Sequence, residues 1–201
     1  MTLRFTALTF ILTLLAACGF SKPSTFYVLD ANTAPRQSLT LKNADSVVIG
    51  IEQISIPTYL DRPQIVLRDA ETSTIMIAEF HRWAEHISDV MPRVLADAIS
   101  ERAGYPLAKQ VDVNREFLKY RLYVEVQRFD ATPNGEAVLD AWWLINDADG
   151  QTLYRTRSTL VEPVSDTYPS LVKAEQKLIR ELGFTIADYY KKNIKQTKRA
   201  K

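Results

Sequence analysis

From residue 117 to residue 127 the sequence alternates between apolar and polar residues with a period of two. Such alternation places successive side chains on opposite faces of a β-strand, so one face can be buried while the other stays in water. Two turn sequences follow, Thr-Pro-Asn-Gly at 132–135 and Asp-Ala-Asp-Gly at 147–150. Because such turns join antiparallel strands, the region predicts a three-stranded meander. Its strands are expected from residue 117, over 137–145 and over 152–161.

Two amphipathic helices are predicted, one before and one after the meander. The first has Ser88 as its N-cap, Pro92 in its first turn, where a missing N–H costs little, and Gly104 at its end. The second can be capped by Ser165 or Asp166. The apolar residues that share one helical face are Val90, Val94, Leu95, Ala98 and Ile99 in the first helix, and Leu171, Ala174, Leu178, Leu182 and Ile186 in the second.

The first third of the chain contains short runs rich in β-branched and aromatic residues, which are typical of strands. Residues 31–45 between them are read as a loop or a ragged strand. Short strands, a helix, a meander and a helix together predict an α+β fold with a mixed, mainly antiparallel sheet and two helices packed on one face. The short strands are expected over 26–29, 47–51, 65–68 and 75–77.

Cys18 is the only cysteine in the 201 residues, so no disulfide framework is possible within one chain. Residues 1–17 have the order of a secretory signal: one positive charge at Arg4, an apolar stretch and then small residues. The stretch is too short to span a bilayer, which needs about 20 apolar residues. Leu-Ala-Ala-Cys at 15–18 resembles a bacterial lipobox, in which a peptidase cuts before the cysteine and lipid is attached to it. We therefore expect a covalent lipid on Cys18 and no other cofactor.

Residue 19, which follows the cysteine, is glycine. Lipoproteins kept at the inner membrane usually carry aspartate there, so the resemblance implies the periplasmic face of the outer membrane of a Gram-negative bacterium. Several acyl chains on one residue anchor stably, whereas one chain binds only marginally. The linker 18–25 is short, since seven extended residues reach at most about 25 Å. The folded part is therefore expected to stay close to the membrane.

The remaining sequence suits one domain over residues 26–190, followed by a basic tail over 191–201. The tail carries six basic residues and no acidic one, although the whole chain has a net charge of only +1. Without the tail and Arg4, 18 basic residues stand against 24 acidic ones, so the body is near −6. The tail can be a solvated end or can attract anionic lipid head groups. No nucleic-acid partner is expected.

Local signatures of catalysis or metal binding are not found in the sequence. His81 and His86 have the wrong spacing for a zinc protease motif, and the Asp-x-Asp-Gly at 147–150 reads as a hairpin turn because Ile145 stands where a calcium loop needs its first carboxylate. No nucleophile elbow or phosphate-binding glycine loop occurs. We expect no catalytic residue and no metal site, although scattered Ser, Asp and His could still assemble in space.

Two stretches could contact a partner or could be scaffold. Pro57 and Pro63 restrict the backbone around residues 59–62, which predicts a stiff connection in which Arg62 holds Asp61 or a nearby carbonyl. Trp83 can be core or an interface anchor. Trp142 and Trp143 are expected on opposite faces of one strand. The candidate partner-binding or scaffold residues are Tyr59, Leu60, Asp61, Arg62, Pro63, Gln64 and Trp83.

Four sequence phrases carry a resemblance to a known family. These are FYVLD from residue 26, IPTYLDRPQIVLR from 56, AEFHRWAE from 78 and LVKAEQKLIRELGFTIADYY from 171, all after the lipobox. They resemble the auxiliary lipoprotein family of ABC-type intermembrane transport, typified by PqiC (also called YmbA), over nearly all of the mature chain. One departure is His86, where the family pattern has proline.

The resemblance implies an outer-membrane lipoprotein that serves an MCE-type lipid transporter and supports membrane integrity. Its partners would be an MCE-domain protein and inner-membrane transporter components, with the inner leaflet of the outer membrane as its support. A homo-oligomer is expected because a tubular partner presents several equivalent edges. Two alternatives stay open: a lipid or cell-wall hydrolase anchored as a lipoprotein, and a stand-alone structural envelope lipoprotein.

Overall fold

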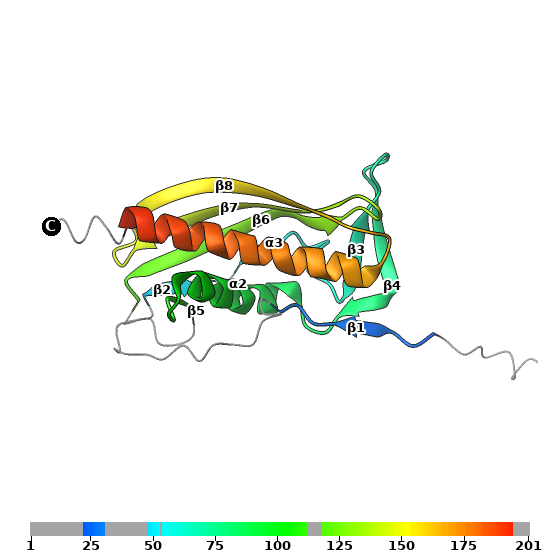
Figure 1. The fold of residues 1–201 in the computed structure, drawn as a ribbon, viewed down its shortest axis with the longest axis horizontal. Coiled ribbons are helices and arrows are strands. Elements are labelled where there is room, and N and C mark those ends of the chain that lie inside the picture. Colours follow the sequence, from blue (N-terminus) through cyan, green and yellow to red (C-terminus); the bar gives the residue numbers. More distant parts are fainter. Residues whose placement is uncertain (1–21, 31–47, 53, 112–117, 195–201) are drawn as a thin grey trace, which may run out of the picture.

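The computed structural model describes residues 22–30, 48–52, 54–111 and 118–194 (Figure 1). Cys18, the predicted signal segment 1–17 and residues 195–201 of the predicted tail lie outside the described residues, as does the predicted loop 31–45. The described chain forms a mixed eight-stranded sheet and two long helices, which confirms the predicted α+β fold. The strands are β1 (Thr25–Tyr27), β2 (Ile49–Ile51), β3 (Gln64–Arg68), β4 (Ile75–Trp83), β5 (Ala108–Gln110), β6 (Tyr120–Ala131), β7 (Glu136–Asp147) and β8 (Thr152–Pro163).

The predicted meander is confirmed as β6, β7 and β8, each of 12 residues. β6 pairs antiparallel with β7, and β7 with β8, along almost their whole length. Both turns have the expected backbone: Asn134 and Gly150 adopt positive φ angles of 53° and 86°. These conformations favour Asn and Gly, which explains why the turn sequences were recognisable.

β6 is the strand that joins the two parts of the sheet. On the side away from β7 it pairs in parallel with β2 near its start and with β3 near its end. β2 leads to β5 at one end of the molecule, and β3 leads to β4 and β1 at the other end (Figure 1). The long pairings are antiparallel and the short ones at these ends are largely parallel.

Most predicted strand ends shift by one or two residues, and the two larger differences concern β4 and β5. β4 extends to Trp83, six residues beyond its predicted end, because a bulge against β3 interrupts the alternation of its side chains. β5 was not predicted at all. It has only three residues, and it exists because β2 offers a free parallel edge. Neither the bulge nor a three-residue strand produces a regular alternation that could be recognised in the sequence.

Helix α2 (Ile87–Ala103) and helix α3 (Tyr168–Tyr189) cover the same face of the sheet (Figure 1). The predicted end of α2 is confirmed, since Gly104 has a left-handed φ of 80°. The caps predicted for α3 are wrong: Thr167 is the N-cap, and its hydroxyl accepts a hydrogen bond from the Ser170 N–H at 3.3 Å. A π-helical turn (Tyr190–Ile194) continues α3 into the first four residues of the predicted tail.

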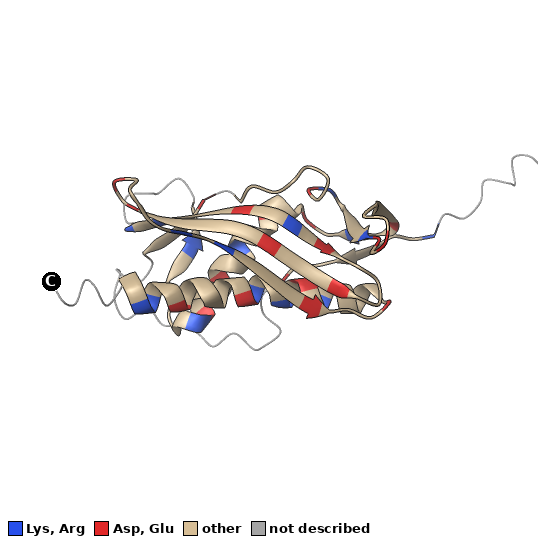
Figure 2. Ribbon diagram, turned by 90° about the horizontal axis from the view of Figure 1, so that it is seen from above, with Lys and Arg blue, Asp and Glu red and all other residues tan. Residues whose placement is uncertain are grey.

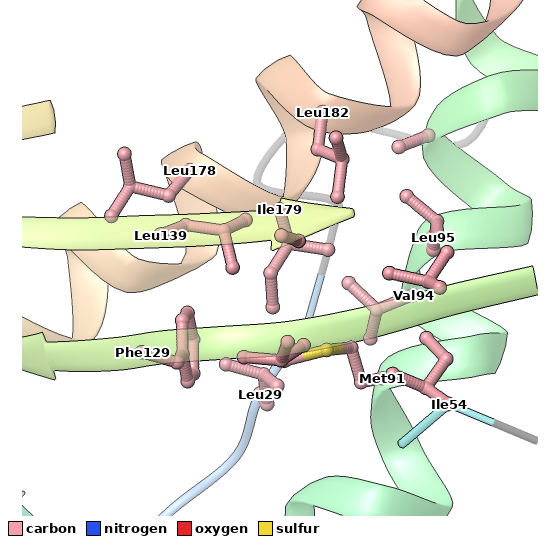
Figure 3. Close-up of a cluster of buried hydrophobic side chains, with 14 of the residues drawn as sticks. Leu29, Ile54, Met91, Val94, Leu95, Phe129, Leu139, Leu178, Ile179 and Leu182 are labelled. Atoms are coloured by element: carbon pink, nitrogen blue, oxygen red, sulfur yellow. The ribbon is translucent and has the colours of Figure 1, made fainter. Parts of the chain in front are cut away.

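The core lies between the sheet and the two helices, and Figure 3 shows its centre. All ten residues predicted to form the helical faces are buried. The helices approach closely at Gly183, where an added Cβ would lie 2.6 Å from the Cβ of Ala98. The side chains labelled in Figure 3 are Leu29, Ile54, Met91, Val94, Leu95, Phe129, Leu139, Leu178, Ile179 and Leu182.

Candidate functional site

Residues 54–63 connect β2 to β3 and are called the crossing segment here. The segment first runs beside β6, where the Ser55 N–H donates to the Val124 carbonyl at 3.0 Å and the Ser55 carbonyl accepts from the Val126 N–H at 2.8 Å. It then turns at Pro57, whose carbonyl accepts from the Leu60 N–H at 2.9 Å. The Leu60 side chain is 1% exposed. Main-chain hydrogen bonds and one buried side chain therefore hold the segment in place.

The Asp61 side chain caps helix α2 from outside the helix. The N-cap residue, His86, makes no capping side-chain bond of its own. Instead, Asp61 Oδ1 accepts from the Ser88 N–H at 3.3 Å and lies 3.7 Å from His86 Nδ1. The first N–H groups of a helix need such acceptors. The prediction that Ser88 is the N-cap is therefore wrong, because the acceptor comes from a residue 27 positions earlier.

Asp61, His86 and Ser88 are residue types that form hydrolase triads, but their arrangement here is that of a helix cap. A triad requires the base to contact the nucleophilic hydroxyl. Ser88 contacts Asp61 through its backbone N–H, not its hydroxyl.

Tyr59, Arg68, Arg128 and Asp130 form a second contact of the crossing segment, called the Asp130 cluster. The Asp130 carboxylate is fully buried and accepts from Arg68 Nη2 at 2.6 Å and from Arg128 Nε at 2.8 Å. Arg68 Nη2 also donates to the Tyr59 hydroxyl at 3.3 Å. A buried charge needs such pairing to be tolerated. The cluster ties the crossing segment to β3 and β6.

The pKa directions in this cluster indicate a structural role. The hydrogen bond between Arg68 and Asp130 raises the pKa of Arg68. Burial raises the pKa of Tyr59, and the negative charge of Asp130 adds to this effect. Arg68 therefore stays charged and Tyr59 stays protonated at neutral pH. These two side chains therefore hold the cluster together and do not exchange protons near pH 7.

The remaining candidate residues divide between core and surface. Trp83 is 4% exposed and lies in the core, and its backbone N–H donates to the Pro63 carbonyl at 2.6 Å. Gln64 is half-buried and pairs in register with Arg82. Arg62 is half-buried too, and its Nε finds no hydrogen-bond partner in the structure.

An open cleft of about 380 Å³ lies between the crossing segment and the start of α2. Asp61 and two serines are among the residues that line it. These groups could exchange hydrogen bonds with a bound chain. The lining residues are Ile54, Ser55, Ile56, Asp61 and Ser88.

The face of the sheet opposite the helices carries charged and aromatic side chains, and Figure 2 shows acidic and basic residues interspersed along the strands. Trp142 lies on this outer face with the guanidinium carbons of Arg155 and Arg157 at 5.1 and 6.0 Å from its ring centroid. Arg157 also pairs with Asp140 and lowers the pKa of that carboxyl. Trp143 points to the core, so the prediction that the two tryptophans face opposite sides is confirmed.

Sequence reasoning did not identify the Asp130 cluster or the group around Trp142. The only signal for the first was a charged residue at the end of an otherwise apolar face, in Arg-Phe-Asp-Ala at 128–131. The second depends on the register of β7 and β8, which brings residues 142 and 157 side by side. A sequence does not contain this register directly.

His81 and the turn at 147–150 take part in contacts that stabilise the fold. His81 Nδ1 lies 2.9 Å from the Tyr27 hydroxyl, and its ring stacks on Tyr168 at 3.7 Å. Asp147 Oδ1 accepts from the N–H groups of residues 149 and 151, which confirms the hairpin turn. Among the described residues, no group of three or more His, Cys, Asp or Glu side chains is placed to hold a metal ion.

A comparison with protein families identifies the class of the chain. Residues 27–187 match the family described as "ABC-type transport auxiliary lipoprotein component", and the chain belongs to this family. The family consists of transport auxiliary components and is not an enzyme family. The resemblance inferred from the four sequence phrases is confirmed.

Two solved structures share the fold. Protein XCC0632 from Xanthomonas campestris is 14% identical and superposes with a TM-score of 0.69, covering 88% of this chain and 99% of that one. A protein described only as uncharacterized is 20% identical with a TM-score of 0.67, covering 83% and 98%. A search of curated proteins finds no match. Within the described residues, neither helix combines the length and apolarity needed to cross a bilayer.

Proposed function

We propose that the chain is an outer-membrane lipoprotein that acts as the docking subunit of an MCE-type intermembrane lipid transport system and so supports envelope integrity. The observation that carries this proposal is the family match over residues 27–187, directly after a lipobox-like sequence that ends in Cys18 and Gly19. The match supports an auxiliary lipoprotein of ABC-type transport. The outer membrane, the MCE partner and the docking role are our inference.

The tether sets the geometry of this function. β1 begins at Thr25, seven residues after the proposed lipidated cysteine, and seven residues reach at most about 25 Å. A domain on such a tether cannot cross the periplasm. The MCE-domain tube and the inner-membrane components must therefore come to it, and we expect several copies of the domain to surround the end of the tube.

The crossing segment supports a docking role because it is rigid and partly exposed. Leu60, Asp61, Pro63 and Trp83 hold it to the core, to α2 and to β4. Arg62 differs from them, because its side chain is only half-buried beside the cleft-lining Asp61, although its Nε is itself buried and makes no hydrogen bond. A guanidinium of this kind can provide much of the energy of an interface.

Arg62→Ala and Asp61→Ala form a matched pair that tests docking. We expect Arg62→Ala to lower co-purification with the MCE protein about tenfold or more, while the free energy of unfolding stays within about 1 kcal/mol. Asp61→Ala should cost about 1 kcal/mol of stability through the lost helix cap. If Arg62→Ala unfolds the protein, or leaves co-purification unchanged, the docking surface lies elsewhere.

The anchor is tested separately. Radiolabelled palmitate should be incorporated into the wild-type chain and not into Cys18→Ser, and only the wild type should fractionate with outer membranes. Failure of palmitate incorporation would remove the basis of the whole proposal.

The expected homo-oligomer is tested by light scattering. The detergent-solubilised lipoprotein should give a mass several times that of one chain.

A further inference from the structure

Large apolar side chains are exposed mainly at one end of the molecule. Eight are exposed among the described residues, and six of them belong to β1, β4 or the residue after β1, so the exposure is concentrated rather than scattered. β1 and β4 are hydrogen-bonded neighbours and lie together at one end in Figure 1. Clustered apolar exposure of this kind marks an interaction surface. The six residues are Phe26, Val28, Ile75, Met76, Ile77 and Phe80. The β1–β4 patch is centred on Phe26 and Phe80, because Phe26 pairs in register with Arg82, two residues from Phe80. Ile75, Met76 and Ile77 lie at the other end of β4, where it pairs with β3.

The exposure of Phe26 follows from the alternation of side chains along β1. In β1 the neighbouring Tyr27 points inward, and its hydroxyl contacts His81, whose ring stacks on Tyr168 of α3. Phe26 pairs in register with Arg82 and is 63% exposed. A strand that buries one side chain must present the next one to the other side. The sequence places phenylalanine at that outward position.

The chain outside the structure ends next to this patch. The described residues begin at Lys22, three residues before β1, and Cys18 precedes Lys22 by four residues. Four residues span at most about 14 Å. Phe26 follows Cys18 by eight residues, which span at most about 29 Å, so a lipid carried by Cys18 keeps Phe26 within that distance of the bilayer surface.

The charges around the patch fit a lipid surface. Lys22 precedes β1, and Arg82 lies beside Phe26. Cations beside apolar side chains suit the boundary where lipid phosphates lie. Acidic residues lie nearby as well: Glu79 on β4, whose backbone carbonyl accepts a hydrogen bond from Arg82 Nε at 3.2 Å, and Glu85 shortly after β4. Both signs can remain in the hydrated head-group layer while the aromatic side chains enter below it.

We propose that the β1–β4 patch is a membrane-contact surface, which inserts Phe26 and Phe80 into the head-group boundary and fixes the orientation of the tethered domain. This inference rests on the proposed lipidation of Cys18. It makes the anchor a two-part contact, in which acyl chains supply the affinity and the patch supplies the orientation. The end of the molecule that carries β2 and β5 then faces away from the membrane.

The test uses the lipidated full-length protein, because lipidation of the only cysteine leaves an introduced thiol as the only free one. Phe80→Cys, or Phe26→Cys as a second position, is labelled with an environment-sensitive dye and placed in phosphatidylethanolamine and phosphatidylglycerol vesicles that contain brominated lipid. Leu153→Cys is the matched control, since Leu153 is similarly exposed. It precedes Tyr154, which stacks on Tyr189 at the far end of α3, about 33 Å from the start of that helix.

We expect the dye at position 80 to be quenched at least about threefold more strongly than the dye at 153, because interfacial apolar surfaces sit roughly 5–10 Å into the boundary. Equal quenching at both positions, in protein whose mass shows the lipid on Cys18, would contradict the proposed membrane contact and leave the lipoprotein assignment intact. A dye at 80 that is already shielded without vesicles would show that copies of the chain cover the patch, and would overturn it too. Absence of the lipid mass would remove both proposals.

Discussion

Trp142 and Trp143 are neighbours in β7, but they lie in opposite environments. Trp143 is 2% exposed, packs against Tyr154 and Tyr189, and donates from Nε1 to the Ser158 hydroxyl at 2.9 Å. Trp142 is half-buried on the outer face, between two arginines of β8. One face of the sheet is stabilised by apolar burial and the other by paired charges.

This difference has consequences for function. The inner face is closed by α2 and α3, and its residues determine whether the domain folds. The outer face and the crossing segment combine charge pairs with partly exposed side chains, so a partner can reach them without disturbing the core. Substitutions on the two faces should therefore separate stability from binding.

Trp143→Ala should have the largest effect, a loss of about 3–5 kcal/mol in the free energy of unfolding, because it removes a fully buried aromatic side chain. Urea denaturation followed by circular dichroism measures this change. A loss below about 1 kcal/mol would mean that the helix-covered face does not carry the stability.

Asp130→Asn should be the next largest, at about 2 kcal/mol, because the substitution leaves two guanidinium groups facing each other without their buried counter-charge. The expected value is below that of a fully buried pair because the side chains of Arg68 and Arg128 are 23% and 33% exposed. Asp149→Asn, in an exposed turn, is the control and should be neutral. Equal effects in both variants would contradict a stabilising role of the Asp130 cluster.

Glu175→Gln should stabilise the protein increasingly as the pH rises. Glu175 in α3 is buried, one of its carboxyl oxygens has no partner, and burial raises its pKa well above 4.5, with a further contribution from Asp130. The folded state therefore favours the protonated acid, and the wild type loses this stability as pH rises above the unfolded pKa and through the folded one. The melting temperatures of the wild type and of Glu175→Gln should be similar at pH 5 and should differ at pH 8. Glu136→Gln, on an exposed residue, should leave the pH dependence unchanged.

Trp142→Ala should have the smallest effect on stability, about 1 kcal/mol or less, which is the value of exposed cation–π contacts. The comparison with Trp143→Ala becomes sharper if Trp142→Ala weakens binding to the MCE protein while the domain remains folded. A large loss of stability would instead assign Trp142 to the scaffold.

The candidate site was only partly predictable. The prolines at 57 and 63 correctly indicated an ordered connection, since their restricted φ angles act locally. The role of Asp61 was not predictable, because its acceptor function depends on a helix that begins 26 residues later. For the same reason, the sequence alone could not separate scaffold residues such as Trp83 from the more exposed Arg62.

The sequence by itself determined the meander, its two turns, the buried faces of both helices and the end of α2 at Gly104. These features follow from side-chain periodicity and from backbone angles that few residues adopt, both of which act over a few positions. Only the tertiary structure decided that β6 joins the two ends of the sheet, that β5 forms, that Asp61 caps α2 and that Phe26 faces outward beside β4. Each of these depends on strand register or on contacts between residues far apart in the chain, which local patterns do not specify.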